Sequence, residues 1–230
     1  MLRPMRALAL TALLLLSACG RPLTTDETSF ARAFLGPDFS PATVRLRGDL
    51  AEERPHSIPV RPRTTCQERI YPQPATATVE VVTGALTAFQ TVYFRPGRYL
   101  EDYLEGLGGE AISLPAAMLF AHEMVHVWQW QNRATTGYHP LKAAVEHVQS
   151  VDPYLFDPNT EVDFLDYGWE QQGRVYEEYL CCRVLAPEAA RTSRLHETLG
   201  KYFDLPPLDV ALAQNVWIPA GGDDLSGICD

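Results

Sequence analysis

The sequence lacks the basic patches that mark proteins which bind nucleic acids. It contains no basic run of five or more residues, and acidic side chains outnumber basic ones by 29 to 19, giving a net charge of −10. Binding to DNA or RNA depends on clustered Lys and Arg that neutralise phosphates. Nucleic acids are therefore excluded as expected partners.

The chain also lacks internal repeats and low-complexity tracts. Beyond its first stretch it has no apolar segment of about 18 residues, the length that a membrane-spanning helix needs. Its 230 residues suffice for one compact domain and are too few for two large ones. A hydrophobic share of 46% is ordinary for a chain that buries a core.

Residues 1–18, which read MLRPMRALALTALLLLSA, have the pattern of an export signal. Arg3 and Arg6 give a positive start, an apolar stretch follows, and small residues end the segment. The alternative is a buried N-terminal core helix. The charge at the chain start and the small residues at the end favour export.

The end of this segment, Leu16-Ser17-Ala18-Cys19, resembles the lipobox of bacterial lipoproteins. The resemblance implies cleavage before Cys19 and attachment of a lipid to its thiol, which anchors a chain to a membrane without spanning it. Residues 19–35 would form the tether and N-terminal segment, flexible to about Thr28. Gly20 in place of Asp implies the outer membrane, in a cell that has one.

Four cysteines remain once Cys19 is set aside. They are Cys66, Cys181, Cys182 and Cys229, an even number in a chain expected to be exported, which favours disulfides. Adjacent cysteines rarely pair with each other, because a disulfide needs a particular Cα separation and torsion. We predict that Cys66 and Cys229 each bond to one member of the adjacent pair. The alternative is four buried free thiols.

The remaining chain, residues 36–230, is predicted to form one α+β domain. Residues 36–75 are rich in proline and should be irregular, and residues 76–82 and 88–94 should form two strands, most simply a hairpin through Thr83-Gly84. Helical patterns cover residues 115–132, 141–149, 167–186 and 188–202. The expected fold is a small sheet or hairpin packed against the first and third of these helices.

The first of these helices contains His122-Glu123-Met124-Val125-His126, an HExxH motif. Histidines four residues apart lie on one helix face, where both imidazoles can reach a single Zn²⁺ ion. Glu123 is rotated by about 100° from His122 and can serve as the base that takes a proton from water. The alternatives are two histidines at the edge of the core, and a zinc site without catalysis.

A third zinc ligand is expected on the helix at 167–186. Glu170 and Glu177 share one face of it but lie about 10 Å apart along the axis, so one must be chosen. We expect Glu170, because Gly173 beside it would let this helix approach the HExxH helix closely. Glu177 and Glu178 are the alternative ligands.

An HExxH helix followed by a glutamate on a later helix looks like the gluzincin metallopeptidases. More narrowly, residues 94–99 (FRPGRY) and 119–129 (LFAHEMVHVWQ) resemble the small metallopeptidase-like domain of bacterial extracellular contractile injection systems, over residues 85–185. The resemblance implies a zinc site of His122, His126 and Glu170, with Glu123 as the base.

Gluzincins also use a His or Tyr to stabilise the oxyanion. Tyr138, His139 and His147, between the two helices, are the candidates in this chain. In zincins an edge strand beside the active-site helix holds the peptide by strand addition, and residues 88–94 are expected to take that role.

The sequence thus predicts a zinc peptidase that is lipid-anchored in the bacterial cell envelope and acts on protein or peptide. One alternative is an inactive zinc-binding lipoprotein that acts as a binding or structural module. Another is an enzyme that hydrolyses the peptide cross-links of the cell wall. No sequence feature indicates a particular oligomeric state.

Overall fold

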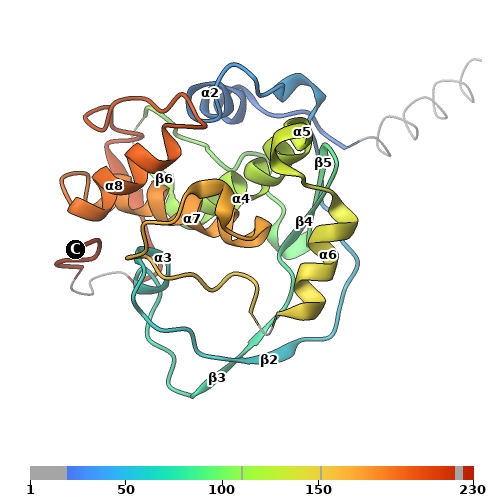
Figure 1. The fold of residues 1–230 in the computed structure, drawn as a ribbon, viewed down its shortest axis with the longest axis horizontal. Helices are drawn as coiled ribbons and strands as arrows, with labels where there is room; N and C mark the ends of the chain where they lie inside the picture. Colours follow the sequence, from blue (N-terminus) through green and yellow to red (C-terminus); the bar gives the residue numbers. More distant parts are fainter. Residues whose placement is uncertain (1–19, 110, 151, 221–224) are drawn as a thin grey trace, which may run out of the picture.

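The computed structural model describes residues 20–109, 111–150, 152–220 and 225–230. The predicted export signal and the lipidated Cys19 lie outside the described residues. The fold is a mixed α+β arrangement, as the sequence predicts (Figure 1). Within the described residues, no helix combines the length and apolar character of a membrane-spanning segment.

Two long helices form the centre of the molecule. Helix α4 spans Leu114–Gln131 and α7 spans Trp169–Leu185, and they pack against each other (Figure 1). Pro115 in the first turn of α4 suits a position whose N–H needs no partner. Most of α4 is buried, since apolar residues surround it on nearly all sides. Helix α8, Ala190–Leu199, packs against α7.

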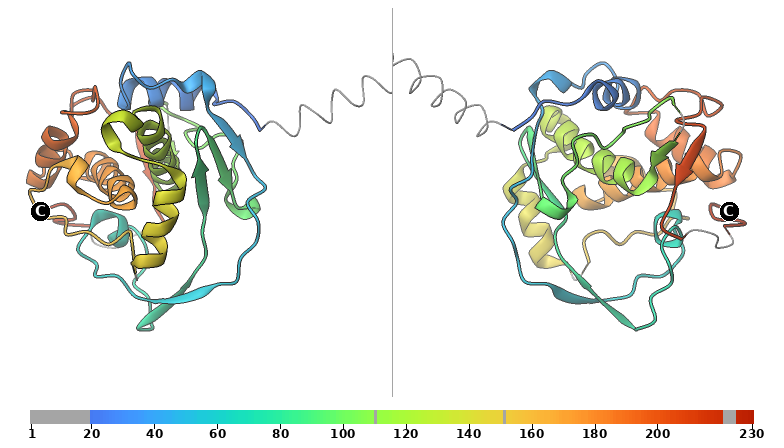
Figure 2. Two further views of the ribbon diagram at one scale, coloured as in Figure 1. Left: turned by 45° about the vertical axis from the view of Figure 1, so that its right-hand side comes forward. Right: turned by 180° about the vertical axis from the view of Figure 1, so that it is seen from behind.

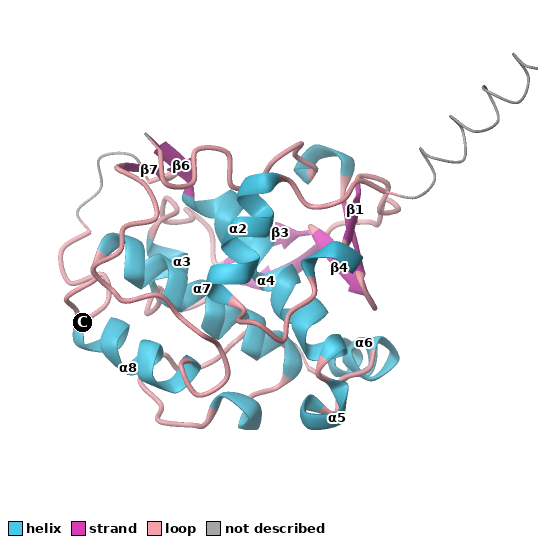
Figure 3. Cartoon of the chain, turned by 90° about the horizontal axis from the view of Figure 1, so that it is seen from above, coloured by secondary structure: helices cyan, strands magenta, loops and turns pink. Residues whose placement is uncertain are grey.

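The N-terminal segment is more ordered than predicted. Helix α2 spans Thr25–Phe34, and the Thr24 hydroxyl and the Glu27 carboxylate each accept a hydrogen bond from the other residue's backbone N–H. Phe30 and Phe34 are buried, and the Phe30 ring contacts Phe120 of α4. Helix α2 thus covers α4 on the side away from the β2–β3 ribbon (Figures 1 and 3). The predicted flexible tether is therefore wrong from Thr25 onward, because a capping box and a buried aromatic face fix this helix.

In the part of the chain that the structure describes, the strands form three small sheets. In the first, β1 (Arg45–Arg47) lies parallel to β5 (Thr91–Phe94), which lies antiparallel to β4 (Ala85–Ala88), so β5 is central and β4 is at an edge. The second is an antiparallel ribbon of β2 (His56–Pro59) and β3 (Thr78–Val81), which crosses the bottom of the molecule (Figures 1 and 2). The third pairs β6 (Ala111–Ser113) with β7 (Asn215–Trp217) in parallel.

The predicted hairpin between residues 76–82 and 88–94 is wrong. The structure instead pairs β4 with β5 through a two-residue turn, Phe89-Gln90, and pairs β3 with the distant β2. Phe89 adopts a positive φ of 59°, and its ring packs 4.7 Å from that of Trp130. Such turns usually carry Gly, Asn or Asp, so the local sequence gives no sign of this one.

The other elements are short and mostly follow the predicted helices. Helix α6 spans Pro140–Gln149, close to the predicted 141–149, and the tail after α8 is mainly irregular. The remaining pieces are α3 (Cys66–Arg69), α5 (Arg133–Thr136), η1 (Pro41–Thr43), η2 (Pro96–Arg98) and η3 (Phe164–Asp166).

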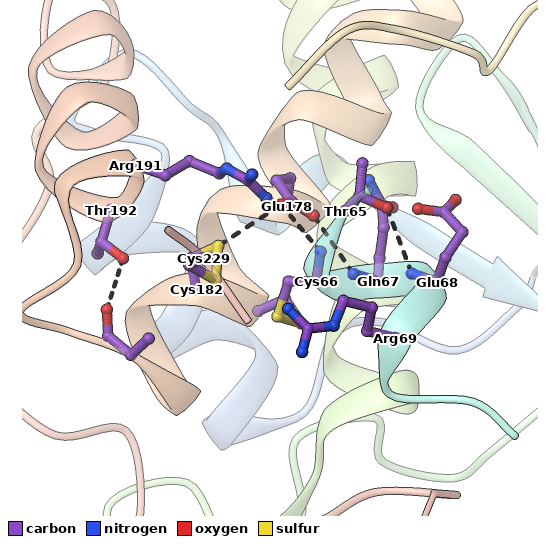
Figure 4. The surroundings of a disulfide bond; sticks show 12 residues. Thr65, Cys66, Gln67, Glu68, Arg69, Glu178, Cys182, Arg191, Thr192 and Cys229 are labelled. Carbon is purple, nitrogen blue, oxygen red and sulfur yellow. Dashed lines mark hydrogen bonds and ion pairs between the residues drawn. A yellow bond between two sulfur atoms is a disulfide. The ribbon is translucent and has the colours of Figure 1, made fainter. Parts of the chain in front are cut away.

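Both predicted disulfides are present. Cys66 bonds to Cys181 and Cys229 bonds to Cys182, with Cα atoms 5.9 and 5.7 Å apart. The two bridges fasten α3 and the end of the chain to α7, and Figure 4 shows the surroundings of the Cys182–Cys229 bridge. They close around the buried carboxylate of Glu178, which accepts hydrogen bonds from the Cys66 N–H and from Arg191.

Candidate metal centre

Helices α4 and α7 bring three potential ligands together. His122 Nε2 and His126 Nε2 lie 3.1 Å apart, and each lies 3.2 Å from Glu170 Oε2. All three side chains are buried, and their ligand atoms lie within 4.8 Å of one another. The HExxH histidines are on one helix and the glutamate on the next, so the metal site depends on how closely the two helices pack.

Gly173 allows this close packing, as the sequence predicts. A Cβ atom at this position would lie 2.5 Å from Cε1 of His122 and 2.8 Å from its Nε2. Carbon atoms in contact normally stay about 3.5–4.0 Å apart. The imidazole of His122 therefore lies directly against the backbone of α7, where a larger residue would displace it.

Each histidine is oriented through its second ring nitrogen. His122 Nδ1 lies 2.7 Å from Glu177 Oε1, and His126 Nδ1 lies 2.8 Å from Gln129 Oε1. The Gln129 amide donates from Nε2 to the Trp169 carbonyl and to Gln172, so its oxygen faces His126. Each Nδ1 atom thus lies beside a side-chain oxygen, and a tautomer with its proton on Nδ1 would leave the Nε2 lone pair free for an ion.

These residues fit a metal ion. Two nitrogen lone pairs and a carboxylate oxygen at about 3 Å repel one another unless a cation or a proton lies among them. Burial lowers the pKa of His122, but its contacts with Glu170 and Glu177 outweigh burial and raise the pKa to about 10. Burial raises the pKa of Glu170, but His126 and His122 outweigh it and hold that pKa well below its ordinary value. The cluster therefore attracts positive charge.

Glu123 is buried and points toward strand β4. Its Oε2 accepts a hydrogen bond of 2.7 Å from the Thr87 hydroxyl. Burial raises the pKa of Glu123, while His122, His126 and the Thr87 bond lower it. A buried carboxylate beside two histidines, with its orientation fixed by one hydroxyl, is suited to accepting and returning a proton.

The alternative ligands lie outside the three-residue cluster. Glu177 Oε1 faces the far ring nitrogen of His122, and its other oxygen accepts from Arg174. Glu178 lies beside the disulfides, bonded to Arg191. The structure thus places Glu170 with the two histidines, in agreement with the choice made from the sequence.

The three oxyanion candidates have different surroundings. Tyr138 is buried and its ring stacks on that of His126, with centroids 5.8 Å apart. His139 caps α6 by accepting a bond from the Leu141 N–H, and the structure does not bring it to the cluster. His147 Nε2 lies 2.9 Å from Glu170 Oε1.

Tyr154 also borders the site and was missed from the sequence. Its ring lies 5.9 Å from that of His122 and 5.4 Å from that of His147. Burial, followed by the charges of Glu170 and Glu123, raises the pKa of Tyr154 well above its ordinary value. It comes from the loop at 152–163, which has no periodic pattern. The one available signal in the sequence was an aromatic residue among prolines and acidic residues.

Comparison with known proteins gives limited guidance. No known protein family matches the chain, and none of the curated proteins matches it in sequence. Among solved structures, the chain is similar to the effector domain of Pseudomonas aeruginosa VgrG2b, with 24% sequence identity and a TM-score of 0.48. The similarity covers 81% of this chain and 85% of that one. At this level it assigns no function, which must come from the residues of the site.

Proposed function

We propose that the chain is a zinc-dependent peptidase. The observation that carries this proposal is that His122 Nε2, His126 Nε2 and Glu170 Oε2 converge on one point. The other ring nitrogen of each histidine, Nδ1, contacts a side-chain oxygen that orients the ring. Two nitrogens and one carboxylate oxygen are a ligand set used by catalytic zinc, with a fourth position left for water or substrate. Structural zinc sites usually have four protein ligands, often cysteines.

The roles of the chain's own residues follow from their positions. When bound, zinc acts as a Lewis acid that polarises a peptide carbonyl and lowers the pKa of water. Glu123 takes the proton from the attacking water and returns it to the leaving amine. The Thr87 hydroxyl holds Glu123 Oε2 and so fixes the direction from which the proton is taken.

Tyr154 is the proposed donor to the oxyanion. Its raised pKa keeps the phenol protonated at neutral pH, so it can donate a hydrogen bond to developing negative charge. It borders both His122 and His147. Tyr138, by contrast, is stacked under His126 and serves as packing.

Strand β4 is proposed to hold the peptide substrate. The strand at 88–94 was expected to do so, but β5 is the central strand of its sheet and offers no edge. Strand β4 is at the edge, and its Thr87 contacts Glu123. The Arg95 N–H donates a hydrogen bond to the Gly84 carbonyl, so these two residues form a hydrogen-bonded pair between the strands. Such pairs alternate with non-hydrogen-bonded pairs along antiparallel strands, so the backbone N–H of Ala85, the next residue, points away from β5. Ala85→Pro should therefore weaken substrate binding while leaving the β4–β5 pairing intact.

We place this activity in the bacterial cell envelope. The export pattern of residues 1–18 supports this location, as does the lipobox resemblance at Cys19. The two disulfides add support, because such bonds persist in oxidising compartments outside the cytosol.

The test is metal content followed by peptide cleavage. Protein lacking residues 1–19 should bind about one zinc per chain, and His126→Ala and Glu170→Ala should lose it. Wild type should then cleave a denatured protein in a zinc-dependent manner, and Glu123→Gln should keep the metal and lose cleavage. A wild-type protein that binds no metal after refolding with zinc would refute the proposal.

A further inference from the structure

Helix α6 turns its apolar side toward solvent. Leu141, Val145 and Val148 are 72%, 50% and 86% exposed, and their spacing of four and then three residues puts them on one face of the helix. The buried residue of α6, Ala143, lies on the opposite side, since successive residues are rotated by about 100°. A surface helix normally buries its apolar stripe, so this reversed arrangement indicates that the exposed face has a partner.

The polar side of α6 is occupied by contacts with the metal centre. Glu146 Oε2 accepts a hydrogen bond of 3.4 Å from the backbone N–H of Glu170. His147 Nε2 lies 2.9 Å from Glu170 Oε1. The helix therefore cannot rotate to bury its apolar face without losing both contacts.

Two aromatic side chains extend the apolar surface beyond α6. Phe89, in the turn between β4 and β5, is 47% exposed, and its ring centroid lies 4.7 Å from that of Trp130. The same ring lies 6.1 Å from that of His139, the residue that caps α6. Single exposed apolar residues are ordinary, whereas neighbouring ones mark an interaction surface.

The border of this surface carries positive charge, although the whole chain has a net charge of −10. Arg133 and Lys142 are exposed, and the Arg133 guanidinium lies 4.4 Å from the ring centroid of Trp130. Helix α6 contains one acidic residue, Glu146, and it is turned toward Glu170. An apolar helix face with a Trp and flanking Lys and Arg is typical of helices that lie in a bilayer interface, where the cations meet anionic lipid headgroups.

The expected lipid anchor is close to the folded domain along the chain. The lipobox resemblance puts the lipid on Cys19, the residue before Gly20, where the described chain begins. Arg21 and Leu46 exchange two backbone hydrogen bonds of 2.9 Å each. The chain is thus held by the fold two residues after the lipid, which leaves no long linker between the domain and the bilayer.

The start of the described chain and α6 lie on the same side of the molecule (Figures 1 and 3). The backbone connects them, because the Arg45 N–H donates to the carbonyl of Gln90, the neighbour of Phe89, and Phe89 contacts the cap of α6. A lipid on Cys19 would therefore bring this side of the domain to the bilayer. Anchoring makes docking an intramolecular step, so that even a weakly binding surface is occupied.

We propose that Leu141, Val145 and Val148 of α6, together with Phe89 and Trp130, form a membrane-docking face that lies in the headgroup region of a phospholipid bilayer. This inference rests on the proposed location in the cell envelope and is independent of the peptidase activity. Because the other side of α6 contacts Glu170, docking holds the metal centre close to the bilayer. The polypeptides within its reach are then those at the membrane surface.

The test attaches the domain to vesicles at its natural position. The other four cysteines are in disulfides, so the thiol of Cys19 in a chain of residues 19–230 can be coupled to a maleimide phospholipid. The vesicles contain phosphatidylethanolamine and phosphatidylglycerol, part of it with brominated acyl chains, which quench tryptophan fluorescence at short range. Wild type should be quenched, and Trp130→Phe should lose most of this quenching. Trp217→Phe, which replaces a Trp that is 59% exposed on β7, is the matched control and should keep it.

A charge placed on the docking face should release it from the bilayer. Val145→Glu combined with Val148→Glu should reduce the quenching at least threefold, with zinc content and circular dichroism unchanged. Val210→Glu is the matched control, because Val210 is 52% exposed and lies outside α6, and it should behave as wild type.

Failure of the docking face and failure of the proposed location give different results. The proposal is overturned if wild type is not quenched, or if the double variant is quenched as strongly as wild type. It is also overturned if the uncoupled chain sediments as a dimer and the double variant as a monomer, since a second copy then covers the face. If Cys19→Ala leaves the protein in the membrane fraction of bacterial cells, the lipid anchor fails, whereas the vesicle measurement, with its chemically attached lipid, still decides the docking face.

Discussion

Replacing Gly173 with alanine tests whether the metal geometry depends on backbone contact between the two central helices. The added Cβ would lie 2.5 Å from Cε1 of His122 and 2.6 Å from its Nδ1. A normal carbon contact is about 3.5–4.0 Å. Either the imidazole or helix α7 must therefore move by roughly 1 Å.

A displacement of that size is large for a metal site. Zinc–nitrogen distances are about 2.0–2.1 Å and tolerate deviations of only about 0.2 Å. Moving His122 would also disturb its contact with Glu177, and losing such a partner typically costs about 10–100-fold in metal affinity. We expect Gly173→Ala to weaken zinc binding by at least 100-fold.

The stability of the metal-free protein should change much less. Alanine in place of a mid-helix glycine stabilises a helix by about 1 kcal/mol. Overpacking in a core costs about 1–3 kcal/mol. The two effects partly cancel, so the free energy of unfolding should fall by no more than about 2 kcal/mol.

The assay pairs zinc titration against a chromophoric chelator with urea unfolding in excess chelator. Gly97→Ala is the matched control, because a Cβ there meets no atom within 4 Å. Zinc affinity within threefold of wild type, in a folded Gly173→Ala protein, would refute the claim that His122 lies against α7. A gain of about 1 kcal/mol in stability with unchanged affinity would refute it more strongly.

Three further changes probe other parts of the site. Glu177→Gln keeps the shape of the side chain but removes the charge that faces His122. Zinc affinity, measured by titration, should fall about 10-fold, while circular dichroism should show an intact fold. An unchanged zinc affinity would contradict this role of Glu177. Thr87→Val removes a hydrogen bond that lowers the pKa of Glu123. Zinc content should persist, while the acid limb of the pH profile of kcat/KM should move to higher pH. An acid limb that does not move would argue against Thr87 as the residue that positions Glu123. Cys229→Ser opens a bridge with a sequence separation of 47 and should cost about 4 kcal/mol in urea unfolding, and a loss below about 1 kcal/mol would count against a stabilising bridge.

The parts of the site carried by single helices could be predicted from the sequence. The spacing of His122 and His126 fixes their common face wherever a helix forms, and α4 forms almost where predicted. Gly173 favoured Glu170 as the residue that joins the two histidines, because a mid-helix glycine is unfavourable unless a neighbour needs the space. Because adjacent cysteines rarely pair, the sequence predicted that Cys66 and Cys229 each bond to one of them, but not which one.

The parts that depend on distant pairing could not be predicted. β3 pairs with β2, some twenty residues earlier, and no local pattern distinguishes this from a hairpin with the following strand. The turn at Phe89 carries none of the usual turn residues, since tertiary contact with Trp130 holds it. Tyr154 reaches His122 from a loop whose Leu155 carbonyl accepts a hydrogen bond from Gln171 of α7, a contact distant in sequence. Helix α2 is different, because the capping residues Thr24 and Glu27 were visible in the sequence.

Helix α7 joins the functional and structural parts of the molecule along its length. Glu170 completes the metal cluster, Gly173 meets the ring of His122, and Glu177 holds that ring from its far side, so three consecutive turns face one histidine helix. About one turn further on, Cys181 and Cys182 fasten α7 to α3 and to the chain end. A metal site that tolerates only about 0.2 Å of error needs its ligand-bearing helices held in a fixed register. The paired disulfides join α7 to α3 and to the chain end, and neither reaches α4, so the register of α7 against α4 depends on the packing at Gly173 and on the contact of Glu177 with His122.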